Sequence, residues 1–334
     1  MKNNLNIIAS SYMQGNDALS LINIDLSNKE YKVLDSVSLK EPSFVIGVNN
    51  IIFTYDKFPL KIKVFKVENH KIKHLSSIDV PLKTLTHLVY NDKYNILYGA
   101  SYADGSYFKV NYNLNTLRFE RMQCFYQGGK CHCVSISEDK EYLYITNIEQ
   151  DRIYKYDNDL TLIKILELPK GIGPRHSIIY DKKIFVITEY SNELYVYDEN
   201  SFKFLYSHST LSTQIISHGG TLLFSKDHEY IYCSNRGEET IAIFKYNNKV
   251  ESINNIKNID NLDNKDNLDN NINIKYIESI SCYGQHSRHM ILSNCGKYII
   301  SCNKNSNDIA FIKLDNGKLM MKIPYQKVSC VYQL

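Results

Sequence analysis

Seven side chains of this sequence combine cationic, acidic and imidazole chemistry that could serve a small anionic ligand. They are His87, His132, Arg175, Glu189, Arg236, Arg288 and Lys304. Arginine and lysine bind carboxylate or phosphate groups through charge-assisted hydrogen bonds. A carboxylate or a neutral imidazole can remove a proton from water. If these side chains gather at one place, they form a cationic cup with a single carboxylate, which suits an anionic small molecule.

A repeated fold must bring these residues together, because they are spread from residue 87 to residue 304. The sequence contains such a repeat, and its period of about 45 residues is typical of propeller blades. Clear copies at 131–147, 219–235 and 288–303 share a short apolar strand, a polar turn and a second strand that ends in Asn. The copies start near residues 42, 87, 132, 175, 219, 288 and 329.

Four strands in about 45 residues form one blade, so the repeat predicts a single all-β domain over residues 1–334. The predicted fold is a seven-bladed β-propeller with four-stranded antiparallel blades. The last copy has room for one strand, at 328–332, and three strand-like runs, at 6–9, 19–24 and 31–34, precede the first copy. We expect the C-terminal strand to be innermost and to close the ring against the N-terminal strands, which leaves few free edges.

One interval of the repeat is longer than the others, between the copies at 219 and 288. The extra sequence, residues 247–275, is rich in Asn, Asp, Lys and Ile and has no apolar period. Such sequence cannot bury enough apolar surface to fold. We expect a disordered, functionally neutral Asn-rich insertion that follows the third strand of its blade and projects from the blade's outer edge.

Two kinds of blade position should face the same mouth of the central channel, because neighbouring strands of a blade run in opposite directions. The start of the inner strand holds Ser43, His87, His132, Arg175, Gly219 and Arg288. The position after the second strand holds Tyr102, Ile148, Glu189, Arg236 and Lys304. The charged members could also pair with one another and line a solvated funnel. His176 follows Arg175, so strand alternation predicts that it points to the opposite side.

The composition narrows the set of partners. The net charge of +3 is too small to indicate nucleic-acid binding. The N-terminal apolar run is too short for a signal peptide or a membrane span. The eight cysteines are scattered, which is typical of reduced, core-filling thiols in a cytosolic protein. We therefore expect a cytoplasmic monomer or weak homo-oligomer with no nucleic-acid and no membrane partner.

Four strings of the sequence carry a resemblance to a known family. They are Cys131-His132, Gly173-Pro-Arg-His176 followed by Ile184-Phe-Val-Ile-Thr-Glu189, Ser234-Asn-Arg-Gly237, and His286-Ser-Arg-His289. In order and spacing they resemble the seven-bladed lactonases, which include bacterial 6-phosphogluconolactonase and the fungal carboxymuconate-lactonising enzymes. The match extends over nearly the whole chain outside the insertion.

The resemblance implies a site and a reaction. The family's proposed catalytic residues fall, by position, on His132, Arg175, Glu189 and Arg236. The ring of positions adds four candidate substrate-binding residues, His87, Tyr102, Arg288 and Lys304. The expected substrate is an anionic lactone, in first place 6-phosphoglucono-δ-lactone of the pentose phosphate pathway. The arginines would hold the anion and stabilise the oxyanion, while Glu189 or His132 would deprotonate the attacking water.

Four departures from the family pattern leave the substrate open. Thr188 and Ser101 stand where Asn is expected, Ser287 replaces a Pro, and Thr221 occupies a position that is commonly acidic. One alternative is a carboxymuconate cycloisomerase-like enzyme, which could use the same Arg and Glu set. The other is a non-catalytic binding propeller, which should expose aromatic side chains at one mouth rather than Arg and Glu.

We expect no metal and no other cofactor. A calcium site takes about six to eight oxygen ligands, whereas the ring offers one carboxylate. A histidine-only zinc site takes three convergent imidazoles, and the ring offers His87 and His132. The sequence also lacks the Gly-x-Ser-x-Gly motif of a nucleophile elbow.

Overall fold

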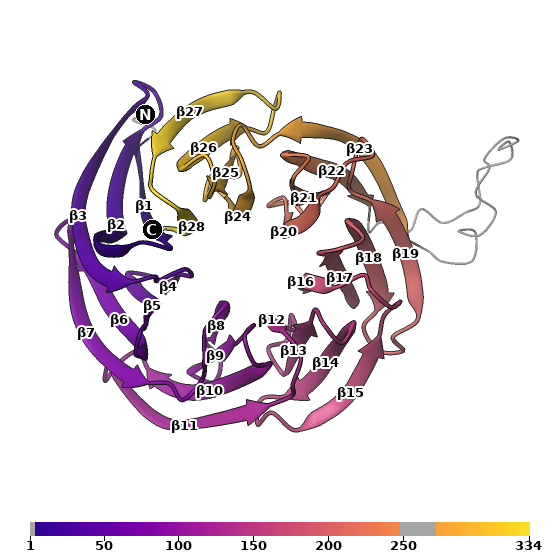
Figure 1. Ribbon diagram of the computed structural model, residues 1–334, viewed down its shortest axis with the longest axis horizontal. Coiled ribbons are helices and arrows are strands. Elements are labelled where there is room, and N and C mark those ends of the chain that lie inside the picture. Colours follow the sequence, from indigo (N-terminus) through magenta and orange to yellow (C-terminus); the bar gives the residue numbers. More distant parts are fainter. Residues whose placement is uncertain (1–3, 248–271) are drawn as a thin grey trace, which may run out of the picture.

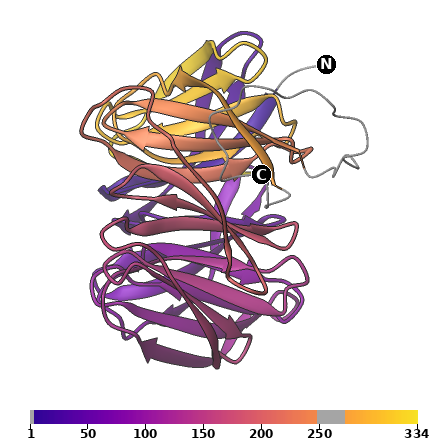
Figure 2. The ribbon, with the colours of Figure 1, turned by 90° about the vertical axis from the view of Figure 1, so that its right-hand side faces the viewer.

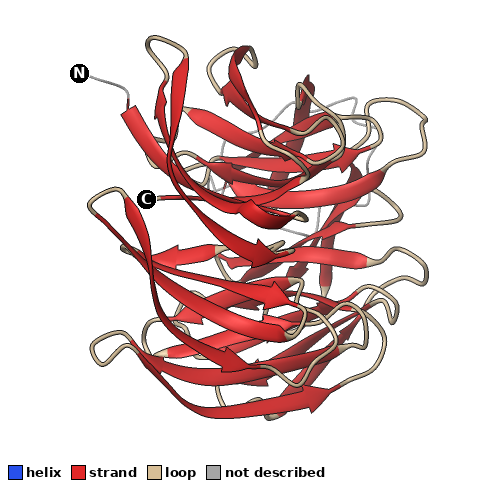
Figure 3. Ribbon diagram, turned by 60° about the vertical axis from the view of Figure 1, so that its left-hand side comes forward, coloured by secondary structure: helices blue, strands red, loops and turns tan. Residues whose placement is uncertain are grey.

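The computed structural model describes residues 4–247 and 272–334, which form seven four-stranded antiparallel sheets arranged as blades around one axis (Figure 1). The predicted seven-bladed β-propeller is therefore confirmed. Figure 2 views the same ring from its edge, and Figure 3 shows that strands joined by loops account for the described residues, with no helix among them. Within those two ranges, no helix has the length and apolarity needed to cross a membrane.

The four strands of each blade run from an innermost strand at the axis to an outermost strand at the rim. In that order, blade 1 contains β28 (Val328–Gln333), β1 (Asn4–Ser11), β2 (Gln14–Asp25) and β3 (Glu30–Lys40). Blade 2 contains β4 (Ile46–Val48), β5 (Ile51–Lys57), β6 (Leu60–Glu68) and β7 (Lys71–Asp79). Blade 3 contains β8 (His87–Asn91), β9 (Ile96–Ala100), β10 (Ser106–Asn113) and β11 (Arg118–Tyr126). Blade 4 contains β12 (Cys131–Ile136), β13 (Tyr142–Asn147), β14 (Arg152–Asp157) and β15 (Leu162–Glu167).

The remaining blades follow the same order. Blade 5 contains β16 (Pro174–Tyr180), β17 (Lys183–Thr188), β18 (Glu193–Asp198) and β19 (Phe204–Ser209). Blade 6 contains β20 (His218–Phe224), β21 (Tyr230–Arg236), β22 (Thr240–Asn247) and β23 (Asn273–Ser281). Blade 7 contains β24 (Ser287–Leu292), β25 (Tyr298–Asn303), β26 (Asp308–Lys313) and β27 (Leu319–Pro324).

Blade 1 closes the ring from both ends of the chain, as predicted. The C-terminal strand β28 is innermost and pairs with β1, so that Tyr332 lies opposite Ile8 and Cys330 opposite Ser10. Figure 1 shows β28 and β1 side by side in this one blade. The closure pairs the inner edge of β1, which would otherwise be a free sheet edge.

The core lies between neighbouring blades, because each sheet packs one face against the blade before it and the other against the blade after it. The middle strands are therefore buried on both faces and consist of nearly continuous apolar runs. Strand β9 is buried along its whole length, whereas the outermost strand β15 exposes Leu162, Ile163 and Ile165. All eight cysteines are free thiols; six are buried, and Cys124 and Cys295 are exposed rather than core-filling.

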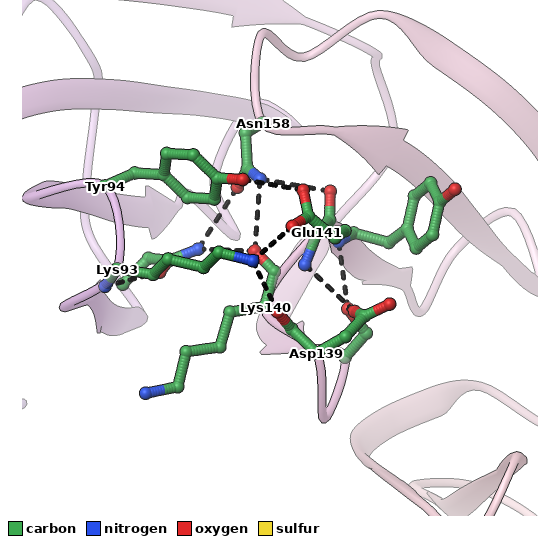
Figure 4. Close-up of polar contacts among 9 residues, drawn as sticks. Lys93, Tyr94, Asp139, Lys140, Glu141 and Asn158 are labelled. Atoms are coloured by element: carbon green, nitrogen blue, oxygen red, sulfur yellow. Dashed lines mark hydrogen bonds and ion pairs between the residues drawn. The ribbon is translucent and has the colours of Figure 1, made fainter.

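Polar contacts also join neighbouring blades at the mouth where the first and second strands are connected (Figure 4). In the turn of blade 3, Lys93 contacts Glu141 of blade 4, and Tyr94 Oη donates to Glu141 Oε2 over 2.7 Å. Asn91 Nδ2 of blade 3 donates to Asn158 Oδ1 of blade 4 over 3.1 Å. These contacts fix the relative position of two blades at the mouth opposite the candidate site.

The Asn-rich segment predicted at 247–275 lies between the third and fourth strands of blade 6, as expected. Its residues 248–271 lie outside the described residues, so its disorder stays a prediction. The two strands extend further into the segment than the sequence indicates: Asn247 of β22 pairs with Asn273 of β23.

Candidate active site

The inner strands of blades 4 to 7 share a β-bulge at the end that faces the candidate site. In blade 5, Pro174 pairs with Thr188 and His176 with Ile187, so Arg175 is an extra residue in the inner strand. In blade 7, Arg288 is the extra residue between Ser287 and His289. The same register shift occurs around His132 in blade 4 and around Gly220 in blade 6. A bulge re-aims the side chains next to it, and here it directs His132, Arg175 and Arg288 toward the axis.

Hydroxyl groups of the neighbouring strands hold the bulged backbone in place. Thr146 Oγ1 accepts a hydrogen bond from the Cys133 N–H over 3.0 Å and donates to the Arg175 carbonyl over 2.8 Å. Ser234 Oγ accepts from the Thr221 N–H over 2.8 Å. Thr146 therefore links blade 4 directly to the bulge that carries Arg175 in blade 5.

Glu189 is bound between two arginines. Its Oε2 lies 3.2 Å from Arg175 Nε, and its Oε1 lies 3.3 Å from Arg236 Nη2. The Arg175 and Arg236 side chains are almost fully buried, at 1% and 4% exposure, whereas Glu189 retains 16%. The structure thus brings together three of the four predicted catalytic residues.

Two glycine carbonyls complete the contacts of these arginines. Arg175 Nη1 donates to the Gly220 carbonyl and Arg236 Nη2 to the Gly219 carbonyl, both over 2.6 Å. A Cβ atom at Gly219 would lie 2.0 Å from the Thr188 carbonyl oxygen. Only glycine therefore lets this stretch of β20 approach β17 closely enough to accept from the arginines.

A pocket of about 300 Å³ opens next to this cluster. It is lined by Tyr12, Ser43, Tyr102, His132, Glu189 and Arg288, together with Lys57 and the segment 84–86. A constriction of about 10 Å³, which Arg175, His132 and Arg288 also line, continues from it along the axis. The pocket is thus a partly enclosed polar space with cations, one carboxylate and one imidazole in its walls.

The surroundings set the protonation of the two candidate bases. Burial alone would raise the pKa of Glu189, but Arg175, Arg236 and Arg288 together bring it below its ordinary value of 4.5. Burial, aided by the positive charge of Arg175, lowers the pKa of His132 well below 6.5. Glu189 is therefore a carboxylate and His132 a neutral imidazole at pH 7, and neither ring nitrogen of His132 has a hydrogen-bond partner among the described residues.

The structure places His87 deeper than predicted. Its ring contacts Phe44, with centroids 4.5 Å apart, and its Nε2 lies 3.7 Å from Cys133 Sγ. His87 lines a second space of about 300 Å³ further along the axis, and Thr86 lines the pocket where His87 was expected. Blade 3 has no bulge, since His87 pairs with Ala100 and Leu88 with Gly99 in regular register, and this accounts for the difference.

The expectation that His176 points to the side opposite Arg175 is wrong, because both residues line the same constriction. Its ring lies 5.1 Å from the ring of His132 and 5.6 Å from that of His87, and it lines both inner spaces. The bulge at Arg175 breaks the alternation on which the expectation rested. His289 joins the same layer, with its ring 6.5 Å from that of His176.

Four imidazoles therefore converge on the axis, where the sequence suggested two. Among residues 4–247 and 272–334, no group of three or more His, Cys, Asp or Glu side chains is arranged to hold a metal ion. Burial lowers the pKa of His87 and of His289 to about 3, with a smaller contribution from the charge of Arg175. These rings are consequently neutral and form a polar but uncharged layer beneath the arginines.

Lys304 lies behind the pocket wall rather than in it. Its Nζ is 5.1 Å from the ring centroid of Tyr12, and Tyr12 is a pocket residue that was not predicted from the sequence. Tyr12 follows the last residue of β1, the second strand of blade 1. It thus occupies the blade position that Tyr102, Glu189 and Arg236 occupy in other blades, and continuing the repeat across the ring closure would have found it.

Comparison with known proteins yields one matching family and several related proteins. The family described as "Lactonase, 7-bladed beta-propeller" matches residues 6–263. A 6-phosphogluconolactonase of Formosa agariphila is 24% identical over 298 residues, which cover 80% of this chain and 78% of that protein. The fold of a periplasmic gluconolactonase of Pseudomonas aeruginosa superimposes with a TM-score of 0.84 at 16% identity, with 99% of each chain covered. A putative 6-phosphogluconolactonase of Bacteroides fragilis gives a TM-score of 0.81 at 18% identity over 99% of this chain and 98% of that one.

Proposed function

The chain belongs to the seven-bladed β-propeller lactonase family, and on that premise we propose that it hydrolyses an anionic sugar lactone, with 6-phosphoglucono-δ-lactone as the substrate of choice. The reaction is a carboxylic ester hydrolysis. Its product would be 6-phosphogluconate, and the protein would then act in the cytoplasmic pentose phosphate pathway. The 6-phosphogluconolactonase of Formosa agariphila supports this choice of substrate.

The observation that carries the proposal is the cationic pocket itself. Arg288 lines it, Arg175 lies in the adjoining constriction, and Arg236 stands behind Glu189, which compensates only part of their charge. A volume of about 300 Å³ is at the lower end of the range for small-molecule sites, which suits a single sugar ring. Because the pocket wall carries Lys57, Arg288, Glu189 and His132 beside Tyr12 and Tyr102, a small anion suits it better than a docked protein.

We assign the chemistry to charge stabilisation and proton transfer. Arg175, Arg236 and Arg288 would bind the anion and stabilise the negative charge that develops on the carbonyl oxygen as water attacks. Glu189, held in place by two arginines, would orient them, and a general base in the wall of the pocket would take the proton of the attacking water. Tyr102 lines the pocket and would contact the sugar. The proposal uses no metal and no other cofactor.

Acid release from freshly prepared 6-phosphoglucono-δ-lactone tests this function. We expect a rate well above the spontaneous hydrolysis of the lactone, and a higher kcat/KM than for unphosphorylated glucono-δ-lactone. A rate equal to the spontaneous background with both lactones would refute the proposal. Conversion of a carboxymuconate in the same assay series, with no lactone hydrolysis, would instead assign the same residues to a cycloisomerase.

A further inference from the structure

The ring closure places a tyrosine in the wall of the pocket. Tyr12 lies in the turn between β1 and β2, and its backbone N–H donates to the Lys327 carbonyl over 3.0 Å, next to the innermost strand β28. The following turn is fixed by the Met13 N–H, which donates to Ser11 Oγ over 3.2 Å. The position of Tyr12 is therefore set by the pairing of the two chain ends.

Two cations surround the phenol of Tyr12. Its Oη accepts a hydrogen bond from Arg288 Nε over 3.0 Å, and Arg288 Cζ lies 5.9 Å from the ring centroid. Lys304 Nζ lies 5.1 Å from the same centroid. The ring shares the pocket with His132 and Glu189. Arg288 thus holds the Tyr12 hydroxyl at the edge of a pocket large enough for a sugar ring. In this position the hydroxyl can contact a bound substrate.

The other acidic and basic groups of the pocket are less suited to remove a proton from water. Both oxygens of Glu189 are engaged by arginines, at 3.2 and 3.3 Å. A carboxylate held in this way is a weak base, because protonation would cost it two ion pairs. The imidazole of His132 is 3% exposed and sits among cations that oppose its protonation.

The charges that face Tyr12 favour its ionised form. Burial would raise the pKa of Tyr12, but Arg288, a hydrogen bond with Ser43 and the charge of Lys304 bring it below 10.0. Of the other titratable groups around it, Tyr55 on β5 stays a phenol because burial raises its pKa, and Glu189 faces it across the pocket as a carboxylate. A phenolate in this position is a far stronger base than a carboxylate, and its pKa moves toward the range in which general bases work best.

We propose that Tyr12 is the general base of the lactone hydrolysis, an inference that rests on the function proposed above. The Tyr12 phenolate takes a proton from water as the water oxygen bonds to the lactone carbonyl carbon, and the carbonyl oxygen becomes an oxyanion beside the arginines. The ring C–O bond then breaks, and the leaving alkoxide takes the proton back from Tyr12 Oη. The new carboxylic acid releases its proton to solvent, so Tyr12 returns to its starting form.

The first experiment removes the hydroxyl group of Tyr12 in one variant and changes its acidity in another. Tyr12→Phe should lower kcat by about 100-fold or more and leave KM nearly unchanged, because a general base acts in the chemical step. Tyr31→Phe, on the outer strand β3 with 43% of the residue exposed, is the matched control and should keep wild-type kinetics. A fluorinated tyrosine incorporated at position 12, which is more acidic and nearly isosteric, should shift the rising limb of the kcat–pH profile, where activity appears as Tyr12 loses its proton, to lower pH.

A second measurement needs no substrate. The ultraviolet difference titration of wild type minus Tyr12→Phe should show one tyrosine that ionises below pH 10. An active Tyr12→Phe with an unchanged pH profile, or an unshifted limb in the fluorotyrosine protein, would overturn the role of Tyr12 while the proposed function stands. Absence of lactone hydrolysis by the wild-type protein would overturn both, whatever the titration shows.

Discussion

Arg175 lies on β16 and Glu189 directly follows the neighbouring strand β17, and their Nε and Oε2 atoms lie 3.2 Å apart. The guanidinium is almost fully buried, and the carboxylate reaches the pocket. The pair therefore joins the buried end of the site to the surface that a substrate would meet. Because Arg236 binds the other oxygen of Glu189, any change to this carboxylate alters two arginines at once.

Glu189→Gln should reduce both activity and stability. The amide keeps the shape of the side chain but removes the charge that compensates Arg175 and Arg236. We expect kcat/KM to fall by about 100-fold, as for the loss of a preorganised electrostatic group. The free energy of unfolding should fall by about 2 kcal/mol, less than for a fully buried pair because Glu189 is 16% exposed. Lactone kinetics and urea denaturation measure the two effects.

Glu167→Gln is the control for this change. Glu167 pairs with Arg152 over 2.9 Å on the outer strand of blade 4, where both side chains are largely solvated, at 62% and 40% exposure. Such a pair contributes little to stability. If Glu189→Gln proved as harmless as Glu167→Gln in both assays, Glu189 would have no place in the site.

Arg288→Ala should weaken substrate binding and also lower kcat, because Arg288 donates a hydrogen bond to Tyr12 Oη. Loss of one charge-assisted hydrogen bond to an anion costs about 1.5–3 kcal/mol, which corresponds to a rise in KM of roughly 10- to 100-fold. The loss should be larger for the phosphorylated lactone than for the unphosphorylated one. Arg118→Ala, on the exposed outer strand β11, should leave both KM values unchanged. An equal rise in KM for the two lactones would argue that Arg288 does not contact the phosphate.

The sequence predicted the ring and the convergence of Arg175, Glu189 and Arg236, because the blade period alone determines which positions share a mouth. It could not predict which side chains face the axis within the inner strand, because that depends on bulges. A bulge turns His176 inward in blade 5, and its absence in blade 3 leaves His87 one layer deeper than expected. The sequence did not predict Tyr12 as a site residue, because the strands of its blade come from opposite ends of the chain.

Gly219→Ala should disturb the site from its backbone side. The added methyl group would lie 2.0 Å from the Thr188 carbonyl oxygen, so β20 must move. The carbonyls of Gly219 and Gly220 would then move away from Arg236 and Arg175, which donate to them. We expect a loss of about 1–3 kcal/mol of stability from this overpacking and a lower kcat/KM. Gly47→Ala, in blade 2, would meet the ring of Tyr332 at 2.3 Å and is the matched control. It should destabilise the protein without lowering the activity of the folded fraction; an equal effect on activity would show that the Gly219 carbonyl has no special role.

The layer of neutral imidazoles should make stability depend on pH. The pKa values of His87 and His289 are lowered to about 3 from 6.5, so between these values the unfolded chain binds more protons than the folded chain. The free energy of unfolding should therefore rise with pH from about 3 to 6.5 and level off above it, by up to about 1.4 kcal/mol per pH unit for each histidine. Urea denaturation at a series of pH values measures this slope. His87→Gln should lower this slope by the equivalent of about one bound proton. A slope that His87→Gln does not alter would mean that this imidazole is already protonated, or freely solvated, in the folded protein.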